Sequence, residues 1–405
     1  VLDLPLEAGN MHRTYLFTPS NHPRKVEKVF DAGADAVILD LEDAVANAEK
    51  PAARDAAVAA LKQPRPCRGY VRVNAIDTPL CYRDLVTVVG PWLDGIVLPK
   101  VESAVSLGTI DWMLTQLEAE AELAPGHLDL VPIIETGAGI HRLDEILGAG
   151  TRVRRVAFGA GDYHLDMNLE WRPDEAALDD ARARLVRISR AHGLEPPIDT
   201  VVIHIRDADR LQRSALRGRE FGFQGKLCIH PAQVGPCNEI FSPSAEEVAH
   251  AERVVAAFEA AQAKGSASIQ LDGYFIDYPI VYRAHRILEL QRALLGGRGA
   301  GSTIPASDDA VGLEFGHFGV AESEQPAVDF TIGLADRLAE PVDATGCPGQ
   351  ARHDVRHRQI ADSGVGHAPD VFAGCVLRVL EDLVDGCHRP AGNLRLVAQV
   401  QHLAL

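Results

Sequence analysis

The sequence predicts an α/β fold, a (β/α)8 or TIM barrel with an extra C-terminal helical segment. From residue 13 onward, short runs rich in Val, Ile and Leu alternate with longer amphipathic stretches, which is typical of parallel strands buried on both faces. Eight such units within about 250 residues match a barrel. A doubly wound open sheet is the main alternative, but no GxGxxG follows an early strand. FGAGD at 158–162 has only half of that pattern, and we interpret it as a turn.

The expected strands share β-branched and aromatic residues in runs of five or six, and an amphipathic stretch follows each run. The strands are expected at residues 14–18, 36–41, 69–74, 95–99, 130–135, 155–159, 200–205 and 226–230. The helices are expected at residues 23–32, 49–62, 82–89, 103–121, 139–148, 175–192, 208–221 and 245–263. Cap-like residues precede three of them, namely Ser103, Asp174 and Ser244, the last followed by Glu246 and Glu247.

Composition excludes several classes of partner. The chain has 405 residues, 46% of them hydrophobic, and a formal net charge of -17. This charge would repel nucleic acid and anionic membranes, although a local pocket can still bind a small anion. No apolar run approaches the roughly 20 residues that span a bilayer, and the first residues lack the basic region of a signal peptide. The seven cysteines form no CxxC pair, so we expect free thiols in a cytoplasmic protein.

The two ends of the chain differ from its middle. The first strand-like run begins just after Met11, so we expect residues 1–10 to be a dispensable extension and residues 11–298 to form the catalytic domain. Residues 299–405 are expected to be a disordered or non-family tail, because they contain no Lys, Tyr, Trp or Met. Out-of-frame translation of GC-rich DNA would give the same composition.

The tail still contains two features of interest. Residues 371–384 are its best helix candidate. Cys375, Cys387 and His388 suggest a zinc site, but their spacing fits no standard zinc motif.

Charged or polar side chains follow six of the eight expected strands. They are Asp40, Glu42 and Asp43 after the second strand, Arg72 and Asn74 at the third, Lys100 and Glu102 at the fourth, Glu135 at the fifth, Asp162 at the sixth and His230 at the eighth. In a barrel, the carboxyl ends of all strands meet at one face, which carries the functional groups. Helix capping alone does not explain six such positions.

Glu135 and Asp162 are the metal candidates. Two hard carboxylate ligands, with the remaining positions left to water and substrate, suit Mg2+. The alternatives are an N-cap for Asp162 and a buried ion pair for Glu135. A second group, Asp40, Glu42 and Asp43, consists of alternative ligands, of acids that surround the ligands without binding the metal, or of acids that hold basic side chains in place.

Arg72 lies within a strand, and a buried guanidinium suits a carboxylate partner. The partner is either a substrate carboxylate or an acid of the second strand. Arg13 and Lys100 are further candidates for substrate binding; for Lys100 we prefer ion pairing to Schiff-base chemistry. His230 is either an acid or base or a structural hydrogen-bonding residue. Spacing alone makes Asp277 a cap for a helix that runs to about residue 295.

Several motifs, in this order and spacing, resemble the citrate lyase beta-subunit-like family, which is grouped with malyl-CoA and citramalyl-CoA lyases. The resemblance covers about residues 12 to 295. The motifs are RTYLFTPSNHPRKVEKVFDAGADAVILDLEDAV (13–45), VRVN (71–74), VLPKVES (97–103), PIIETGAGI (132–140), FGAGDYHLDM (158–167), GFQGKLCIHPAQV (222–234) and FIDYPIV (275–281).

The resemblance implies a TIM barrel with a C-terminal helical segment, in a homotrimer or hexamer. It implies that a carbon–carbon bond beside a thioester is made or broken, with Mg2+ as cofactor and an acyl-CoA and a keto acid such as glyoxylate or pyruvate as partners. In that picture Glu135 and Asp162 match the Mg2+ ligands, and Arg72 matches the arginine that grips the keto acid. Asp277 matches an acid–base group supplied by a neighbouring subunit, which replaces its interpretation as a cap.

Three other functions remain open at this point. One is a class II aldolase of free hydroxy-dicarboxylic acids, which would not depend on CoA. Another is a malyl-CoA thioesterase, which would release free CoA and malate. The last is a citrate lyase subunit that works only with acyl-carrier and transferase partners.

Overall fold

The structure is a computed structural model that describes residues 12–297. Several predictions lie outside the described residues: the dispensable extension 1–10, the tail 299–405, its helix at 371–384 and the zinc interpretation of Cys375, Cys387 and His388.

Eight parallel strands form a closed barrel, as predicted. The strands are β1 (Thr14–Pro19), β2 (Ala36–Asp40), β3 (Arg68–Arg72), β4 (Gly95–Leu98), β5 (Asp129–Ile134), β6 (Ala157–Phe158), β7 (Ile198–Asp199) and β8 (Gly225–Cys228). Each strand pairs with the next along the chain, and β1 also pairs with β8, which closes the barrel.

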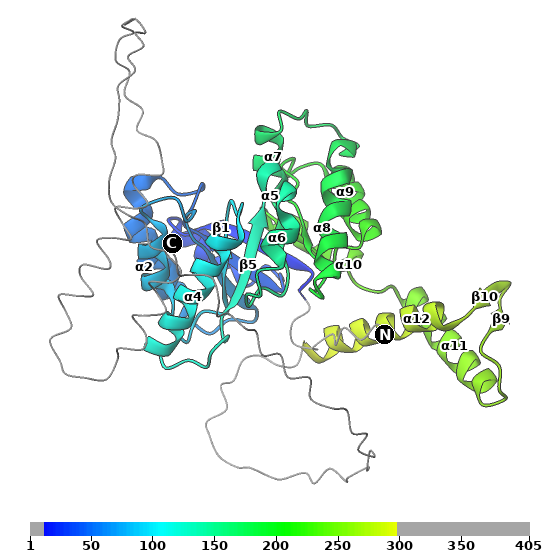
Figure 1. Cartoon of the computed structure of the whole chain (residues 1–405). Helices are drawn as coiled ribbons and strands as arrows, with labels where there is room; N and C mark the ends of the chain where they lie inside the picture. The colour runs from blue at the N-terminus through cyan, green and yellow to red at the C-terminus, as the bar shows by residue number, and fades with distance from the viewer. Residues whose placement is uncertain (1–11, 298–405) are drawn as a thin grey trace, which may run out of the picture. The chain divides into compact units, whose positions relative to one another are not determined.

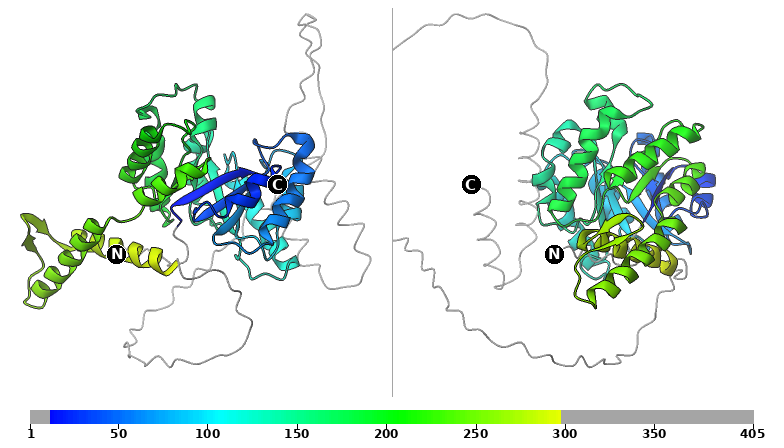
Figure 2. Two further views of the ribbon diagram at one scale, coloured as in Figure 1. Left: turned by 180° about the vertical axis from the view of Figure 1, so that it is seen from behind. Right: turned by 90° about the vertical axis from the view of Figure 1, so that its right-hand side faces the viewer.

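Helices surround the strands (Figures 1 and 2). They are α1 (Pro23–Val29), α2 (Lys50–Leu61), α3 (Cys81–Val88), α4 (Ala104–Glu120), α5 (Gly137–His141), α6 (Leu143–Leu147), α7 (Ala160–Asp166), α8 (Asp179–Ala191), α9 (Ala208–Phe221) and α10 (Val234–Ile240), with short 3-10 turns at Asn47–Glu49, Ala176–Leu178 and Pro231–Gln233. Within residues 12–297, no helix combines the length and the apolar character that crossing a membrane requires.

Strand alternation divides the core into two layers. In β2, Ile38 belongs to a cluster of inward-facing side chains that fills the barrel. Val37 and Leu39 belong to the larger cluster between the sheet and the helices. The same alternation directs Asp40 and Arg72, the last residues of β2 and β3, to the inside of the barrel.

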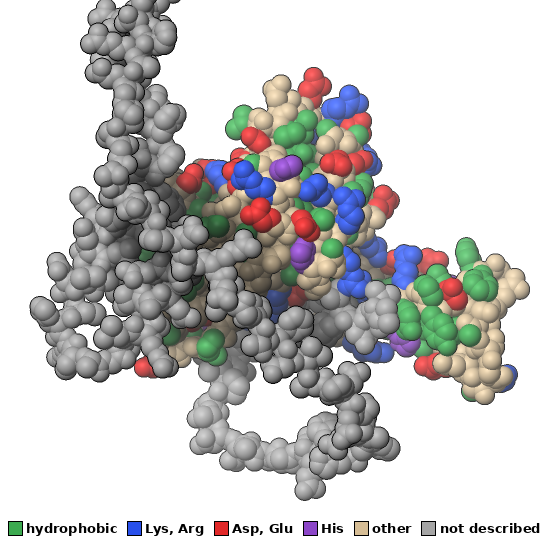
Figure 3. Space-filling model, in the orientation of Figure 1, with side chains coloured by type: hydrophobic (Ala, Val, Ile, Leu, Met, Phe, Trp, Pro, Cys, Tyr) green, Lys and Arg blue, Asp and Glu red, His purple; other side chains and the backbone are tan. Residues whose placement is uncertain are grey.

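The C-terminal segment has a core of its own. It consists of α11 (Ala245–Gln262), an antiparallel hairpin of β9 (Ile269–Leu271) and β10 (Tyr274–Ile276), and α12 (Tyr278–Gly297). Phe258, Ile276 and Val281 pack together in a separate hydrophobic cluster. Tyr274 and Phe275 of the hairpin are each 67% exposed, and Figure 3 shows apolar side chains on the surface of this segment.

The predicted seventh strand is misplaced. The strand is Ile198–Asp199, and residues 200–205 leave the sheet. The backbone of this segment forms a hydrogen bond outside the sheet: the Val202 carbonyl accepts from the Gln233 side chain at 2.8 Å. Ile203 and Ile205, which made the run look like a strand, are 44% and 46% exposed.

Other boundaries also differ from the prediction. The helix expected at 139–148 is two helices, α5 and α6, and the one expected at 175–192 begins as a 3-10 turn. Ser103 and Ser244 cap α4 and α11 as predicted, the latter in a capping box with Glu247. Asp174 caps no long helix; it pairs with Arg172 at 3.0 Å on the surface.

Candidate active site at the carboxyl ends of the strands

Asp40 holds Arg72 in a fixed orientation. The two residues are register partners at the ends of β2 and β3. Arg72 donates from Nε to Asp40 Oδ1 at 2.7 Å and from Nη2 to Oδ2 at 2.6 Å, a bidentate geometry that few other pairs can form. The guanidinium also lies 4.9 Å from the centre of the Phe17 ring. Burial opposes its charge, but Asp40 and Glu42 outweigh burial and raise the pKa of Arg72, so it stays charged.

Glu42 and Lys100 extend this ion-pair network. Glu42 Oε2 lies 2.9 Å from Arg72 Nη1, and Glu42 Oε1 accepts from Lys100 Nζ at 2.6 Å. Lys100 Nζ also lies 3.1 Å from Asp43 and 3.7 Å from Asp162. Of the two roles that the sequence left open for these acids, the structure shows the pairing with Arg72 and Lys100.

Glu135 directly follows β5, at the carboxyl end of that strand, and is 4% exposed. Its Oε1 accepts from the Lys100 backbone N–H at 2.7 Å. A Cβ atom at position 159 would clash with the Glu135 carboxylate, so Gly159 makes room for it. This close approach explains the first glycine of FGAGD. The interpretation of FGAGD as a turn was wrong, because its last three residues begin α7.

The negative charge of the Glu135 carboxylate is poorly stabilised by its surroundings. Burial first, and then the neighbouring Asp162 and Glu42 carboxylates, raise the pKa of Glu135 to about 8, although Arg72 and the Lys100 amide oppose the shift. Within residues 12–297 no basic side chain forms an ion pair with it. The alternative of a buried ion pair therefore does not describe Glu135.

This pKa predicts how stability depends on pH when a chelator removes divalent cations. Glu135 ordinarily titrates at 4.5, so between that pH and about 8 the native state holds a proton that the unfolded state has lost. The free energy of unfolding should fall as the pH rises through this range. Urea unfolding at several pH values should show a smaller fall for Glu135→Gln, which cannot titrate. Equal slopes in the two proteins would contradict the assignment.

Asp162 lies in the first turn of α7, directly after β6. It is not the N-cap of that helix, because Gly159 occupies the cap position. The two acids remain the candidates for holding a cation. In the part of the chain that the structure describes, no three His, Cys, Asp or Glu side chains converge as a complete metal site. A pair of carboxylates, with further positions left to water or ligand, is typical of Mg2+.

A support beneath the loop after β2 was not predicted. Lys50, at the start of α2, is 4% exposed. It donates to the carbonyls of Leu41 and Glu42, both at 2.8 Å, and to Asn74 Oδ1 at 2.5 Å. Asn74 in turn donates to Asp84 at 2.6 Å. These bonds fix the backbone that carries Glu42, and a helical lysine in a sequence gives no sign of such a role.

Three predicted residues lie outside this cluster. Arg13 precedes β1, at the opposite end of the barrel, where it pairs with Asp35 at 2.7 Å, so the structure does not bring it to the site. His230 follows β8 at the correct end, but it is exposed and its Nδ1 accepts from the Ala232 N–H at 3.2 Å. Asp277 directly precedes α12; among the described residues it forms no hydrogen bond or ion pair with the cluster.

Comparisons with known proteins agree with the sequence motifs. A family model, HpcH/HpaI aldolase/citrate lyase, matches residues 13–231. The chain is 34% identical over 285 residues to the citrate lyase subunit beta of Leuconostoc mesenteroides subsp. cremoris, covering 70% of this chain and 94% of the relative. It is 32% identical over 306 residues to the L-malyl-CoA/beta-methylmalyl-CoA lyase of Rhodobacter capsulatus, covering 70% and 96%.

A solved structure is also similar. The CitE protein of Mycobacterium tuberculosis, in complex with magnesium, acetoacetate and coenzyme A, has a TM-score of 0.58 and 31% identity, covering 70% of this chain and 98% of that one. The family model spans more than half of the chain. The chain therefore belongs to the HpcH/HpaI aldolase/citrate lyase family, as its motifs predict.

Proposed function

We propose that the chain is a Mg2+-dependent carbon–carbon lyase that acts, in either direction, on a 3-hydroxyacyl-CoA thioester. Malyl-CoA, citramalyl-CoA and a citryl thioester are the substrates considered, and the products are an acyl-CoA and a keto acid. Relatives named citrate lyase subunit beta and L-malyl-CoA/beta-methylmalyl-CoA lyase support this class. The observation that carries the proposal is a buried carboxylate, Glu135, that forms no ion pair with a basic side chain among the described residues and lies near Asp162 and a rigidly held Arg72.

Glu135 and Asp162 fit a divalent cation. A buried carboxylate with a raised pKa is electrostatically uncompensated, and a cation between it and Asp162 would compensate both. Both ligands are hard oxygen donors, which Mg2+ prefers, and a magnesium ion is bound in the similar CitE structure. A bound Mg2+ would supply Lewis-acid stabilisation for the alkoxide that is left when the hydroxyl group of the thioester loses its proton in cleavage, and for the charge that develops on the keto oxygen as the bond forms in condensation.

Arg72 binds the carboxylate of the keto acid. A guanidinium has five N–H donors, and Asp40 accepts from two of them. Donors on Nη1 and Nη2 remain for a ligand. Asp40 thus serves as a positioning residue, because it fixes the plane in which Arg72 presents those donors.

Asp277 moves the proton at the carbon beside the thioester carbonyl. In cleavage, the electrons of the breaking bond form a thioester enolate, and Asp277 returns a proton to that carbon; in condensation it removes the proton. We propose that it acts in the site of a neighbouring subunit of a homotrimer or hexamer. The exposed Tyr274 and Phe275 of the same segment suit burial against another copy.

Arg72→Lys is expected to weaken keto acid binding at least about tenfold, since it keeps the charge but loses the planar fork and its charged hydrogen bonds. Calorimetric titration with pyruvate in the presence of Mg2+ measures this. Arg68→Lys is the matched control, because Arg68 lies at the other end of β3 and bonds to Asp94 at 2.6 Å. Unchanged affinity in Arg72→Lys would refute the role of Arg72.

Products of malyl-CoA and citramalyl-CoA distinguish the proposal from its alternatives. The proposed lyase forms acetyl-CoA together with glyoxylate or pyruvate. Free CoA with malate would indicate a thioesterase. Cleavage of the free hydroxy acid without CoA would indicate an aldolase, and activity only after carrier and transferase partners are added would indicate a dependent subunit.

A further inference from the structure

Two cross-links join the segment after β5 to the segment after β6. The first lies where the strands end, since the Gly159 N–H donates to the Ile134 carbonyl at 3.0 Å. The second lies further along both segments, where the Gly137 N–H donates to Asp166 Oδ2 at 2.7 Å. In each segment the proposed metal ligand lies between these two cross-links along the chain.

Asp166 is well placed to link the two segments. It is the last residue of α7 and follows Asp162 by four positions, and residues four apart lie on the same face of a helix. Gly137 is the first residue of α5, so its N–H has no acceptor within that helix. The carboxylate of Asp166 supplies this acceptor, and a charged acceptor makes a stronger bond than a neutral one.

Close packing accompanies this bond. A Cβ atom at position 137 would lie 2.7 Å from Met167 Sδ and 3.3 Å from Asp166 Oδ2. Met167 directly follows α7 and is its C-cap residue. The end of α7 therefore lies directly against the start of α5, and the glycine allows this approach.

We propose that Asp166 is a positioning residue for the cation site. It holds Glu135 and Asp162 at the separation that a divalent cation requires, and it does not bind the cation itself. This inference rests on the proposed function and deepens it. A site binds more tightly when its ligands are already in place, because ordering them at the moment of binding reduces the affinity.

Two substitutions of Asp166 separate the hydrogen bond from the charge. Asparagine keeps a carbonyl oxygen that can accept from the Gly137 N–H, whereas alanine has no acceptor. Electron paramagnetic resonance measures Mn2+ binding by the full chain. Outer contacts of a metal site change its affinity by roughly 10- to 100-fold. Because this bond is exposed, we expect a loss of about three- to tenfold in Asp166→Ala and of about twofold or less in Asp166→Asn.

Gly137→Pro removes the donor and leaves Asp166 in place. Proline suits the first position of a helix, and Thr136 has φ −135° and ψ 158°, which is typical of a residue before proline. Met167 is 45% exposed and can move away from the ring. If Asp166 acts through the bond, Asp166→Ala should cause no further loss of Mn2+ affinity in the Gly137→Pro protein.

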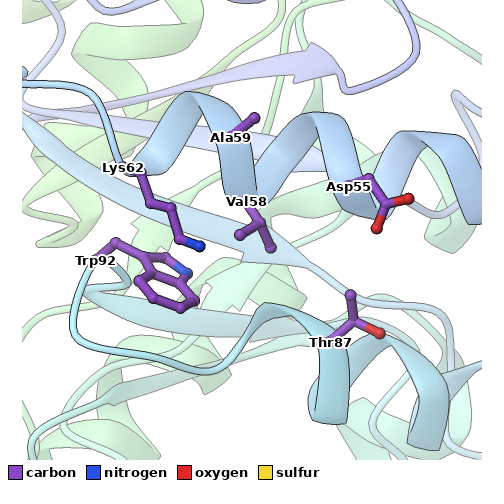
Figure 4. A pocket seen from close by; sticks show the side chains of 6 residues that line it. All are labelled: Asp55, Val58, Ala59, Lys62, Thr87 and Trp92. Carbon is purple, nitrogen blue, oxygen red and sulfur yellow. The ribbon is translucent and has the colours of Figure 1, made fainter.

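Asp180→Ala and Asp55→Ala are controls for loss of charge. Burial, then Asp180 and then Asp166, raise the pKa of Tyr163, so both acids lie near that ring. Asp55 is remote, beside a cavity of about 440 Å³ between α2 and α3 on the outside of the barrel (Figure 4). Each control should keep the Mn2+ affinity within about twofold of the wild type, because exposed charges are screened.

Hydrogen exchange in chelator tests the bond without a cation. The amides of residues 136–142 should exchange faster in Asp166→Ala than in the wild type and change little in Asp166→Asn, because the loss of the bond opens this turn more often. Equal exchange in Asp166→Ala and the wild type would contradict the second cross-link.

Two results of Mn2+ binding would overturn the inference alone. One is an unchanged affinity in Asp166→Ala, and the other is an equal loss in Asp166→Ala and Asp166→Asn, which would assign the effect to charge. A wild-type protein that binds no Mn2+ would overturn the proposed cation site as well. That result appears before any variant is compared, so the two failures are distinguishable.

Discussion

Replacing Glu135 or Asp162 by alanine is expected to abolish Mg2+-dependent turnover, with a loss of at least about a thousandfold, because Lewis-acid stabilisation is worth several kcal/mol. Each substitution removes one of the two proposed ligands and would leave a single carboxylate to hold the cation. Initial rates at saturating and at limiting Mg2+ measure the effect, together with Mn2+ binding followed by electron paramagnetic resonance.

The fold should survive these substitutions. Glu135→Ala removes a buried, uncompensated acid, so thermal unfolding in chelator should occur at the same or a higher temperature than for the wild type. Glu170→Ala, an exposed acid that follows α7, is the control and should keep full activity. Full activity in both Glu135→Ala and Asp162→Ala would show that the cation is held elsewhere.

Asp277→Ala is expected to be inactive in lyase turnover although it binds Mg2+ and keto acid normally. If Asp277 acts in a neighbouring subunit, mixing it with the equally inactive Glu135→Ala should restore activity, since some sites then combine an intact Glu135 with an intact Asp277. Random mixing in equal amounts should give roughly a quarter of the wild-type rate in a symmetric oligomer.

Native mass spectrometry of the mixture shows whether mixed oligomers have formed. Asp272→Asn, in the turn of the same hairpin, is the matched control, because Asp272 is exposed and pairs with the exposed Arg253 at 3.4 Å. Mixed oligomers without recovered activity would place Asp277 in the site of its own chain or outside catalysis.

Most of the barrel could be predicted from the sequence, because its strands are buried on both faces and read as apolar runs. AVILDL became β2 within one residue, and the acids after it lie at the predicted end of the barrel. The Asp272–Gly273 turn is a hairpin signal, with φ values of 51° and 85°. The sequence analysis did not use this signal, and neither β9 nor β10 was predicted.

The seventh strand could not be predicted from its own residues. Asp199 is fully buried and is one of the two residues of β7. The residues beside it in the sequence do not indicate that an aspartate is buried in a strand. Its charge is tolerated because Lys226 donates to it at 2.6 Å and Arg182 at 3.0 Å. Those partners come from β8 and α8, so the strand depends on pairing across the fold.

The surroundings of the site residues also depend on contacts between segments that are far apart in the sequence. The sequence indicated which acids and bases lie at the strand ends, but not that the Lys100 amide and Gly159 would frame Glu135. It also did not indicate the left-handed backbone of Lys100. Arg13 was assigned to the site because it is a basic residue next to a strand. It directly precedes β1 and therefore lies at the other end of the barrel.

Condensation by the full chain tests the central claim most directly. The protein is incubated with acetyl-CoA or propionyl-CoA and with glyoxylate or pyruvate, in Mg2+ or in chelator, and the thioesters are identified by mass spectrometry. The proposal predicts a 3-hydroxyacyl-CoA whose mass is that of acyl-CoA plus keto acid, formed in Mg2+ and absent in chelator. No such adduct with any pair, or an adduct that forms equally well in chelator, would contradict it.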